Sequence, residues 1–224
     1  MDHAEHAAHA PHGTGNVNAM AVSATLHCLT GCAIGEIAGL MIGTALGLGN
    51  ASTIVLAIAL AFLFGYTLST LPLLRAGLGV AAALSVVLAA DTLSIATMEV
   101  VDNVVMAIIP GAMDAGLVNV VFWVGMMIAL TAAFLAAYPV NRHLLRRGKG
   151  HALTHEFHGA ATPTGARRFI PALATSTLVA AIVAFMLGGL VVAIADELEG
   201  QGDVMDSTSS ASSSWASVSS PRST

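Results

Sequence analysis

Long runs of apolar residues, separated by short polar stretches, dominate the sequence. A bilayer core about 30 Å thick needs roughly 20 apolar residues per helix, and four uninterrupted runs meet this requirement: 20–48, 52–74, 117–140 and 170–195. A fifth run, 78–109, contains acidic residues and is longer than one straight span needs. We therefore predict an all-α, polytopic bundle of about five transmembrane helices, in which the fifth run crosses once and then continues as a tilted or interfacial segment.

Composition supports this class. Of the 224 residues 56% are hydrophobic and 9% are charged, whereas soluble domains carry roughly a quarter charged residues. The chain is thus expected to be a multi-pass protein of the cell membrane, with the lipid bilayer as its main partner. No positively charged segment precedes the first apolar run, so we do not expect a cleaved secretory signal.

Basic residues predict the orientation of the bundle. Most lie between the runs 117–140 and 170–195, and Arg75 follows the run 52–74. Because cytoplasmic loops are enriched in Lys and Arg, we place both loops and the N-terminus in the cytoplasm and the C-terminus outside. The predicted organisation is a His-rich tail (1–19), a transmembrane domain (20–195) with a basic loop (141–169), and a disordered Ser-rich tail (196–224).

The first apolar run carries polar side chains at helical spacing, in the stretch HCLTGCAIGE. Cys28, Cys32 and Glu36 are four residues apart and share one helix face, with His27 beside it. A disulfide between cysteines so placed has poor geometry, so we expect two free thiols. An ionisable residue within a span is by default a functional candidate, although the cysteines alone are equally compatible with packing as small hydrophobic residues.

Glycine recurs at every fourth position beside this polar face, at residues 31, 35, 39, 43 and 47. Small residues at this spacing let another helix approach closely in lipid. The glycine ridge therefore predicts a tight helix pair and places the polar face toward a neighbouring helix.

The run 78–109 contains a second polar face. Asp91, Ser94, Met98, Asp102 and Met106 cluster on one side of a helical wheel. Glu99 lies at the margin of this face. At 1.5 Å per residue, Glu36 lies about 24 Å from Met20 and Asp91 about 21 Å from Gly77, so we expect these two carboxylates to meet near the same depth. The alternatives are a polar network that holds helices together, or a span that ends early and leaves Glu99 and Asp102 in water.

Thiolate and imidazole ligands suit copper and zinc better than magnesium or calcium. The candidate metal ligands within the membrane are His27, Cys28, Cys32, Glu36, Asp91, Met98, Glu99 and Asp102. Copper is the favoured ion and zinc the alternative. Histidines outside the spans are candidates for accessory metal capture, with a solvated surface as the alternative reading: His3, His6, His9, His12, His151, His155 and His158.

Catalytic and nucleic-acid motifs are missing from the sequence. The stretch HALTHEFH does not match the zinc-protease pattern, and no phosphate-binding or dinucleotide-binding loop and no nucleophile elbow is present. The few, localised basic residues do not favour nucleic acid. An enzyme is therefore not the favoured class.

The combination of HCLTGCAIGE, DTLSIATMEVVDN and FWVGMMIALTAAFLAAYPVNRHLLRRGKGH resembles a family of small bacterial and archaeal membrane proteins catalogued only as a domain of unknown function. The resemblance spans 22–151. It implies a membrane domain whose shared polar residues include His27, Cys28, Cys32, Glu36, Asp91, Glu99 and Asp102. Members are sometimes labelled as copper proteins, which implies no established activity.

Three functions remain open from the sequence. The first is binding, and potentially transport, of a transition metal. The second is a proton- or cation-coupled carrier that uses intramembrane carboxylates. The third is a structural or assembly subunit, which forms a homo-oligomer or joins a larger membrane complex.

Overall fold

The computed structural model describes residues 14–75, 77–147 and 174–218, and within these ranges the side chains of all but 14–16, 90, 175 and 202–218. The described part is all-helical. Its helices are α1 (Thr14–Ala45), α2 (Asn50–Arg75), α3 (Val80–Ile108), α4 (Val120–Arg146) and α6 (Thr175–Val218). The predicted all-α bundle is thus confirmed.

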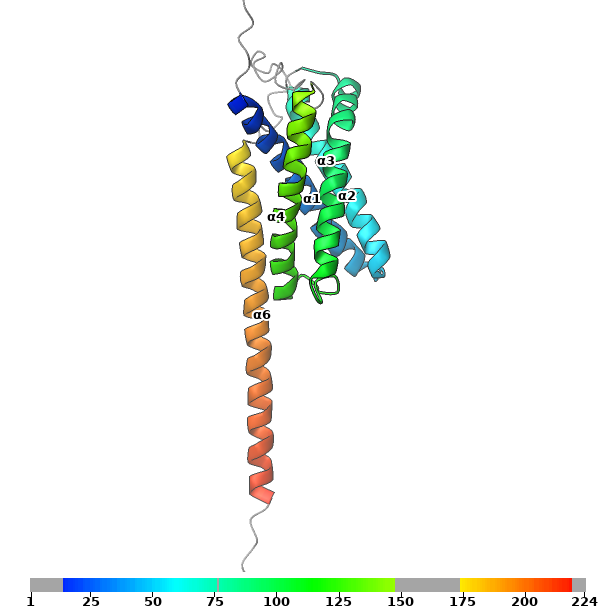
Figure 1. Ribbon diagram of the computed structural model, residues 1–224. Helices are drawn as coiled ribbons and strands as arrows, with labels where there is room; N and C mark the ends of the chain where they lie inside the picture. The colour runs from blue at the N-terminus through cyan, green and yellow to red at the C-terminus, as the bar shows by residue number, and fades with distance from the viewer. Residues whose placement is uncertain (1–13, 76, 148–173, 219–224) are drawn as a thin grey trace, which may run out of the picture.

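The first four helices form a bundle, and α6 lies along one side of it (Figure 1). Helix α1 packs most extensively on α2, and α3 packs most extensively on α4. The turn between α1 and α2 and the loop between α3 and α4 lie at the same end of the bundle, and α6 protrudes beyond that end. We refer to it as the α1–α2 turn end.

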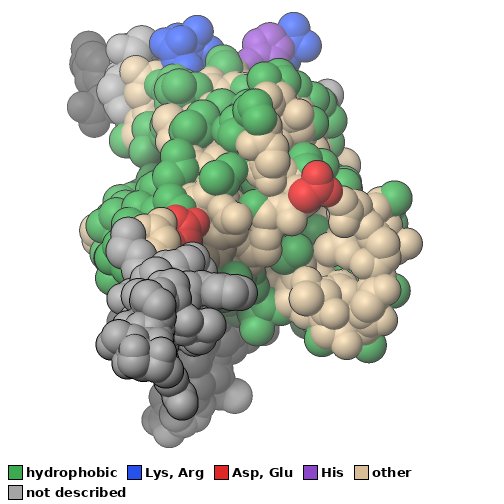
Figure 2. Space-filling view, turned by 90° about the horizontal axis from the view of Figure 1, so that it is seen from below, with side chains coloured by type: hydrophobic (Ala, Val, Ile, Leu, Met, Phe, Trp, Pro, Cys, Tyr) green, Lys and Arg blue, Asp and Glu red, His purple; other side chains and the backbone are tan. Residues whose placement is uncertain are grey.

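Membrane-spanning capacity agrees with the predicted number of crossings. Four of the described helices are long and apolar enough to cross a bilayer, and α3 makes a fifth when its two parts are taken as one span. The parts Val80–Ala89 and Asp91–Ile108 meet at 51°. The long run 78–109 therefore forms one bent helix. The outer surface is suited to lipid, because large hydrophobic side chains such as Val55, Leu135 and Val191 are exposed along the helices. The α1–α2 turn end shows hydrophobic side chains mixed with backbone and other side chains, and isolated acidic ones (Figure 2).

Several helices extend further than their apolar runs. Helix α1 begins at Thr14, inside the predicted tail 1–19, and α4 continues to Arg146, inside the predicted basic loop. Helix α6 continues to Val218, through most of the segment 196–224 that the composition predicts to be disordered. A formed helix extends without a new nucleation step, and no proline interrupts the sequence before Pro221.

The predicted glycine ridge is confirmed as the contact between α1 and α2. A Cβ atom on Gly31, Gly35 or Gly39 would collide with the backbone of α2 at Gly65, Ala61 or Ala57, respectively. Gly47 does not belong to this contact. It follows the end of α1 and has a φ of 64°, which favours glycine in a turn.

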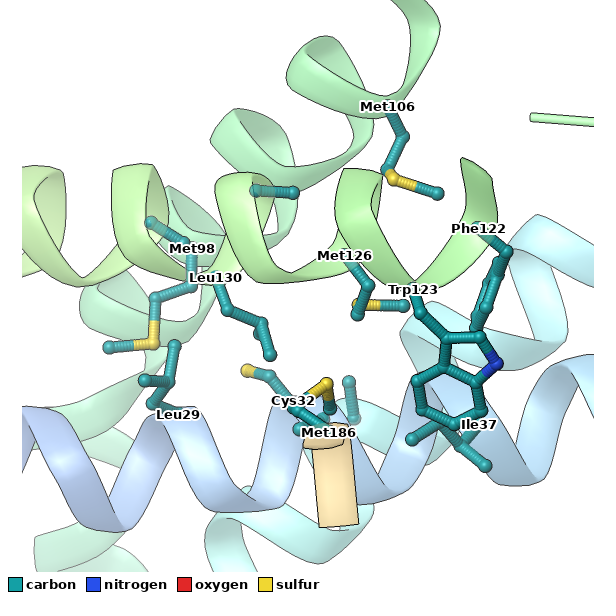
Figure 3. Close-up of a cluster of buried hydrophobic side chains, with 14 of the residues drawn as sticks. Leu29, Cys32, Ile37, Met98, Met106, Phe122, Trp123, Met126, Leu130 and Met186 are labelled. Carbon is teal, nitrogen blue, oxygen red and sulfur yellow. The ribbon is translucent and has the colours of Figure 1, made fainter. Parts of the chain in front are cut away.

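The apolar core lies where α1, α3, α4 and α6 converge. Cys32, Met98, Met126 and Met186 lie in it together with the aromatic pair Phe122 and Trp123 (Figure 3). The indole Nε1 of Trp123 donates to the carbonyl of Leu117 at 2.6 Å, which satisfies the one polar group of that ring. This hydrogen bond also ties the α3–α4 loop to the core.

Candidate functional site

Helix α3 presents one polar face to the interior of the bundle. Asp91, Ser94, Met98, Glu99 and Asp102 are all buried, with exposed fractions between 0% and 5%. Asp91, Ser94, Met98 and Asp102 follow one another at three or four residues and so lie on one side of the helix, with Glu99 at its margin. The polar residues of the run 78–109 are therefore enclosed by protein. The alternative, a span that ends early and leaves Glu99 and Asp102 in water, is wrong.

The polar face of α1 lies opposite that of α3. Cys28 is close to Asp91, Cys32 is close to Glu99, and Glu36 is close to Asp102. The two helices run in parallel directions, so these contacts form successive steps along the bundle. We call this line of paired side chains the polar seam.

The expected meeting of Glu36 with Asp91 does not occur. Glu36 and Asp102 each lie 22 residues after the first residue of their helix, whereas Asp91 lies only 11 residues after the start of α3. The prediction counted residues from the start of each apolar run. It misjudged the register of α1 against α3, because α1 begins at Thr14, before the run 20–48. Glu36 therefore faces Asp102 and Glu99.

Glu36, Glu99 and Asp102 form a group that we call the carboxylate trio. Their exposed fractions are 8%, 4% and 5%. Both oxygens of each glutamate, and Oδ1 of Asp102, make no hydrogen bond of full geometry within the described part of the chain; their polar neighbours are the thiol of Cys32, beside Glu99, and one another. Two carboxylates cannot hydrogen-bond to each other unless one of them carries a proton, and buried charges need partners. The trio therefore requires a proton or a bound cation.

A cavity of about 330 Å³ adjoins the carboxylate trio. Its walls are largely apolar and include Met106 and Met126 from α3 and α4. It extends to Leu48 and Asn50 at the α1–α2 turn and to Asp114 in the α3–α4 loop, all of which are exposed. The cavity is thus a vestibule that connects the trio with the α1–α2 turn end.

One hydrogen bond crosses the mouth of this vestibule. Nδ2 of Asn50 donates to Oδ1 of Asp114 at 2.7 Å. The bond joins the start of α2 to the α3–α4 loop, two segments far apart in the sequence. The partner of Asp114 is a neutral amide, which brings no compensating positive charge to the mouth.

The inner part of the polar seam has a different composition. Around Cys28 lie Asp91 and Ser94 of α3 and Ser69 of α2. These four side chains are exposed by 2% or less. They form a second buried polar group, the inner cluster, which is separated along α1 by two helical turns from Glu36.

His27 precedes Cys28 on α1 and is largely buried. Its Nδ1 lies 2.8 Å from the carbonyl oxygen of Ser23, one turn earlier on the same helix. Within the described residues, no three His, Cys, Asp or Glu side chains come together as ligands for one metal ion. The accessory histidines, at positions 3, 6, 9, 12, 151, 155 and 158, lie outside the described residues.

Cys28 and Cys32 are both free and buried, as predicted. Sequence reasoning did not identify Ser69 of the inner cluster or Asn50 of the vestibule mouth. Ser69 follows Gly65 by one turn, and the close α1–α2 approach at Gly65 was the signal that could have found it. Asn50 could be placed only once the α3–α4 loop was known.

Hydrogen bonds also link α1 to α4 near the opposite end of the bundle. Nδ2 of Asn141 donates to Oγ1 of Thr25 at 2.9 Å, and both residues are buried. Nε of Arg142 donates to Oδ1 of Asn18 at 2.8 Å. In contrast to the carboxylate trio, these polar side chains satisfy one another.

The fold and its interior define a polytopic membrane protein with a carboxylate-lined cavity between its helices. The chain belongs to the family described as domain of unknown function (DUF4396), whose model matches residues 17–150. This match covers α1 to α4 and therefore the whole polar seam, while α6 lies beyond it. Comparison with curated proteins and with solved structures gave no match.

Proposed function

We propose that this protein is a cell-membrane carrier that binds a cation or proton at the carboxylate trio and exchanges it with one side of the membrane through the vestibule. With the orientation predicted from the basic residues, the vestibule faces the outside. Transport would then couple occupancy of the trio to movement of an ion across the bundle.

The observation that carries this proposal is the set of carboxylate oxygens at the end of the cavity that make no hydrogen bond of full geometry within the described residues. Glu36, Glu99 and Asp102 have five such oxygens, all buried. Isolated charges within a membrane are costly, and intramembrane carboxylates commonly mark ion or proton pathways. A role in helix packing alone would favour satisfied hydrogen bonds such as that between Asn141 and Thr25.

The direct test is charge movement in proteoliposomes on a solid-supported membrane. Steps in pH, Na⁺, K⁺ or Zn²⁺ would be applied at constant ionic strength. We expect a transient current with at least one of these ions, and we expect at least a tenfold loss in the variant Glu36→Gln, Glu99→Gln, Asp102→Asn, because the cation would lose its charged partners.

Glu199→Gln is the matched control. Glu199 is an exposed carboxylate on α6, outside the vestibule, so the current should remain. A wild-type protein with no current for any of these ions would contradict the proposal. So would an unchanged current in the triple variant.

A second candidate is binding of a transition metal, with copper favoured and zinc as the alternative. It is supported by the sulfur ligands Cys28, Cys32 and Met98, which are buried along the same seam as the carboxylates. The side chains as placed come in pairs and do not form a shell of three or more ligands. Binding of a metal would therefore require them to rearrange.

Elemental analysis of the purified protein tests this candidate. The comparison is between the wild type and Cys28→Ala, Cys32→Ala. Near-stoichiometric copper or zinc that is lost in the variant would support a thiol site. Equal metal content in both proteins would exclude the cysteines as ligands.

A further inference from the structure

Three helices cross closely at the inner cluster. Gly65 of α2 lies against Gly31 of α1, and a Cβ atom on Gly65 would also come within 2.8 Å of Cδ1 of Ile95 on α3. Ser69 follows Gly65 by one turn, and Ser94 precedes Ile95. The glycine crossing thus brings polar groups from three helices toward one point.

The side chains at this point are a thiol, a carboxylate and two hydroxyls. Ser69 and Ser94 lie beside the sulfur of Cys28, as does Asp91. The exposed fraction is 0% for Cys28 and Ser94, 1% for Asp91 and 2% for Ser69. The cluster is therefore completely enclosed by protein.

The hydroxyls of Ser69 and Ser94 have the thiol of Cys28 as their neighbour, and a thiol is a weak hydrogen-bonding group. Neither Oγ makes a hydrogen bond of full geometry within the described part of the chain. Serine in a helix can bond to the carbonyl one turn earlier, as Thr25, Thr30 and Thr70 do here. Two buried hydroxyls that share one weak sulfur partner keep oxygen lone pairs available, which indicates that these oxygen atoms serve another ligand.

Backbone geometry adds one acceptor atom beside Ser69. Helix α3 stays continuous but bends by 51° between Val80–Ala89 and Asp91–Ile108, just before Asp91. Proline 72 in α2 has no N–H to donate to the carbonyl of Leu68, which precedes Ser69. Backbone carbonyls that are released from helical hydrogen bonds coordinate Na⁺ in membrane transporters, and the carbonyl of Leu68 is available for the same role.

The donor types select the ion. Hydroxyl, carboxylate and carbonyl oxygens are hard ligands, which favour hard cations. One carboxylate balances one positive charge, and the enclosed cluster leaves no surface for a hydration shell. We propose that Ser69, Asp91 and Ser94 form a binding site for a dehydrated monovalent alkali cation of the size of Na⁺, with Cys28 as a neutral packing neighbour.

This site goes beyond the proposed function, because Na⁺ binding here does not require the carboxylate trio or transport. It also assigns Asp91 and Cys28 to a site distinct from a copper centre. If transport is confirmed as well, the inner cluster is where a coupling ion would be held.

Thermal unfolding in detergent tests the site directly. The chain has two cysteines, both buried, so a thiol-reactive fluorogenic dye reports unfolding without any added label. NaCl would be varied against choline chloride at constant ionic strength, with KCl as the competing ion. We expect saturating Na⁺ to raise Tm by about 5 °C, and K⁺ to raise it less.

The decisive variant is Ser69→Ala, Ser94→Ala. Without Na⁺ it should be at least as stable as the wild type, because two buried hydroxyls that have only a weak sulfur partner are removed. Its Na⁺-dependent rise in Tm should be lost. The matched control, Ser52→Ala, Ser85→Ala, removes exposed serines from the same two helices and should keep the full rise.

A rise that persists in Ser69→Ala, Ser94→Ala would overturn the proposal, as would an equal rise with Na⁺ and choline. If that variant does not fold, the Cys32→Ala protein provides an independent readout through the alkylation rate of Cys28. Na⁺ should slow this alkylation several-fold, and an unchanged rate would overturn the proposal.

The outcomes for the two sites are separable. The variant Glu36→Gln, Glu99→Gln, Asp102→Asn leaves the inner cluster intact, so it should retain the Na⁺-dependent rise in Tm whatever happens to its current. A lost rise in this variant would overturn the independence of the two sites.

Discussion

Helix α1 has two contrasting interfaces. On one side Gly31, Gly35 and Gly39 bring its backbone against α2, with no room for a side chain. On the other side Cys28, Cys32 and Glu36 face the polar residues of α3, and a cavity separates parts of the two helices. One interface is filled and apolar, and the other is polar and partly empty.

The contrast separates the residues that stabilise the bundle from those that are available for chemistry. Close helix packing provides van der Waals contact, which is the main source of helix association in lipid. Unpartnered buried carboxylates oppose stability. A change at the glycine interface should therefore affect folding first, and a change at the polar seam should affect function first.

The largest expected effect is at the glycine interface. Gly35→Leu should destabilise the protein by about 3 kcal/mol or prevent folding, because its side chain would collide with the backbone of Ala61. The measurement is Tm together with the yield of monodisperse protein. Gly188→Leu on α6 is the control, since no atom lies within 4 Å of a Cβ there. Equal Tm values for Gly35→Leu and Gly188→Leu would contradict the view that the glycine interface determines the stability of the bundle.

Neutralising the carboxylate trio should have the opposite effect on stability. In buffers free of metal and alkali cations, Glu36→Gln, Glu99→Gln, Asp102→Asn should raise the free energy of unfolding by about 2 kcal/mol, or Tm by roughly 5 °C. The reason is the loss of unpartnered buried charges that repel one another. A lower Tm would mean that the carboxylates hold α1 and α3 together, and the contrast would fail.

The α1–α4 contact offers an intermediate case, because its polar groups are satisfied. Asn141→Ala should cost about 1 kcal/mol, since it removes one buried hydrogen bond. Thr25 would still donate to the carbonyl of Ala21. A double-mutant cycle with Thr25→Val isolates the pair, and a coupling energy near zero would contradict the importance of this bond.

The smallest effect is expected beyond the bundle. A chain that ends at Gln201 retains the apolar part of α6 and loses the segment that protrudes from the bundle. Its free energy of unfolding should change by less than about 0.5 kcal/mol, as measured by Tm. A larger loss would show that the segment contributes to folding of the membrane domain.

Much of the architecture could be predicted from local pattern. The apolar runs gave the spans, and the four-residue spacing of Gly31, Gly35 and Gly39 predicted the tight pair. The polar faces of α1 and α3 followed from helical periodicity, because neighbours on one face are fixed by the helix itself. Helix ends were less predictable, since α1 and α6 extend through polar residues that tolerate helix as well as coil.

Contacts between helices were harder to predict. The register of α1 against α3 depends on where each helix starts and on the bend before Asp91, and neither is visible in hydropathy. The vestibule likewise depends on a loop that brings Asp114 to Asn50. Ser69 could not be predicted as a site residue, because its role depends on its position beside Cys28 and Ser94 in the folded bundle.

The protrusion of α6 has a consequence for the rate at which ions reach the vestibule. Helix α6 passes the start of α4, where the backbone N–H of Val120 donates to Oε1 of Glu197. The exposed acids Asp196, Glu197 and Glu199 therefore lie at the end of the bundle that carries the α3–α4 loop with Asp114. The described arginines lie at the opposite helix ends. An acidic collar of this kind raises the local concentration of cations and accelerates their capture. Its reach is about 10 Å at 0.1 M salt, so capture should slow as ionic strength rises.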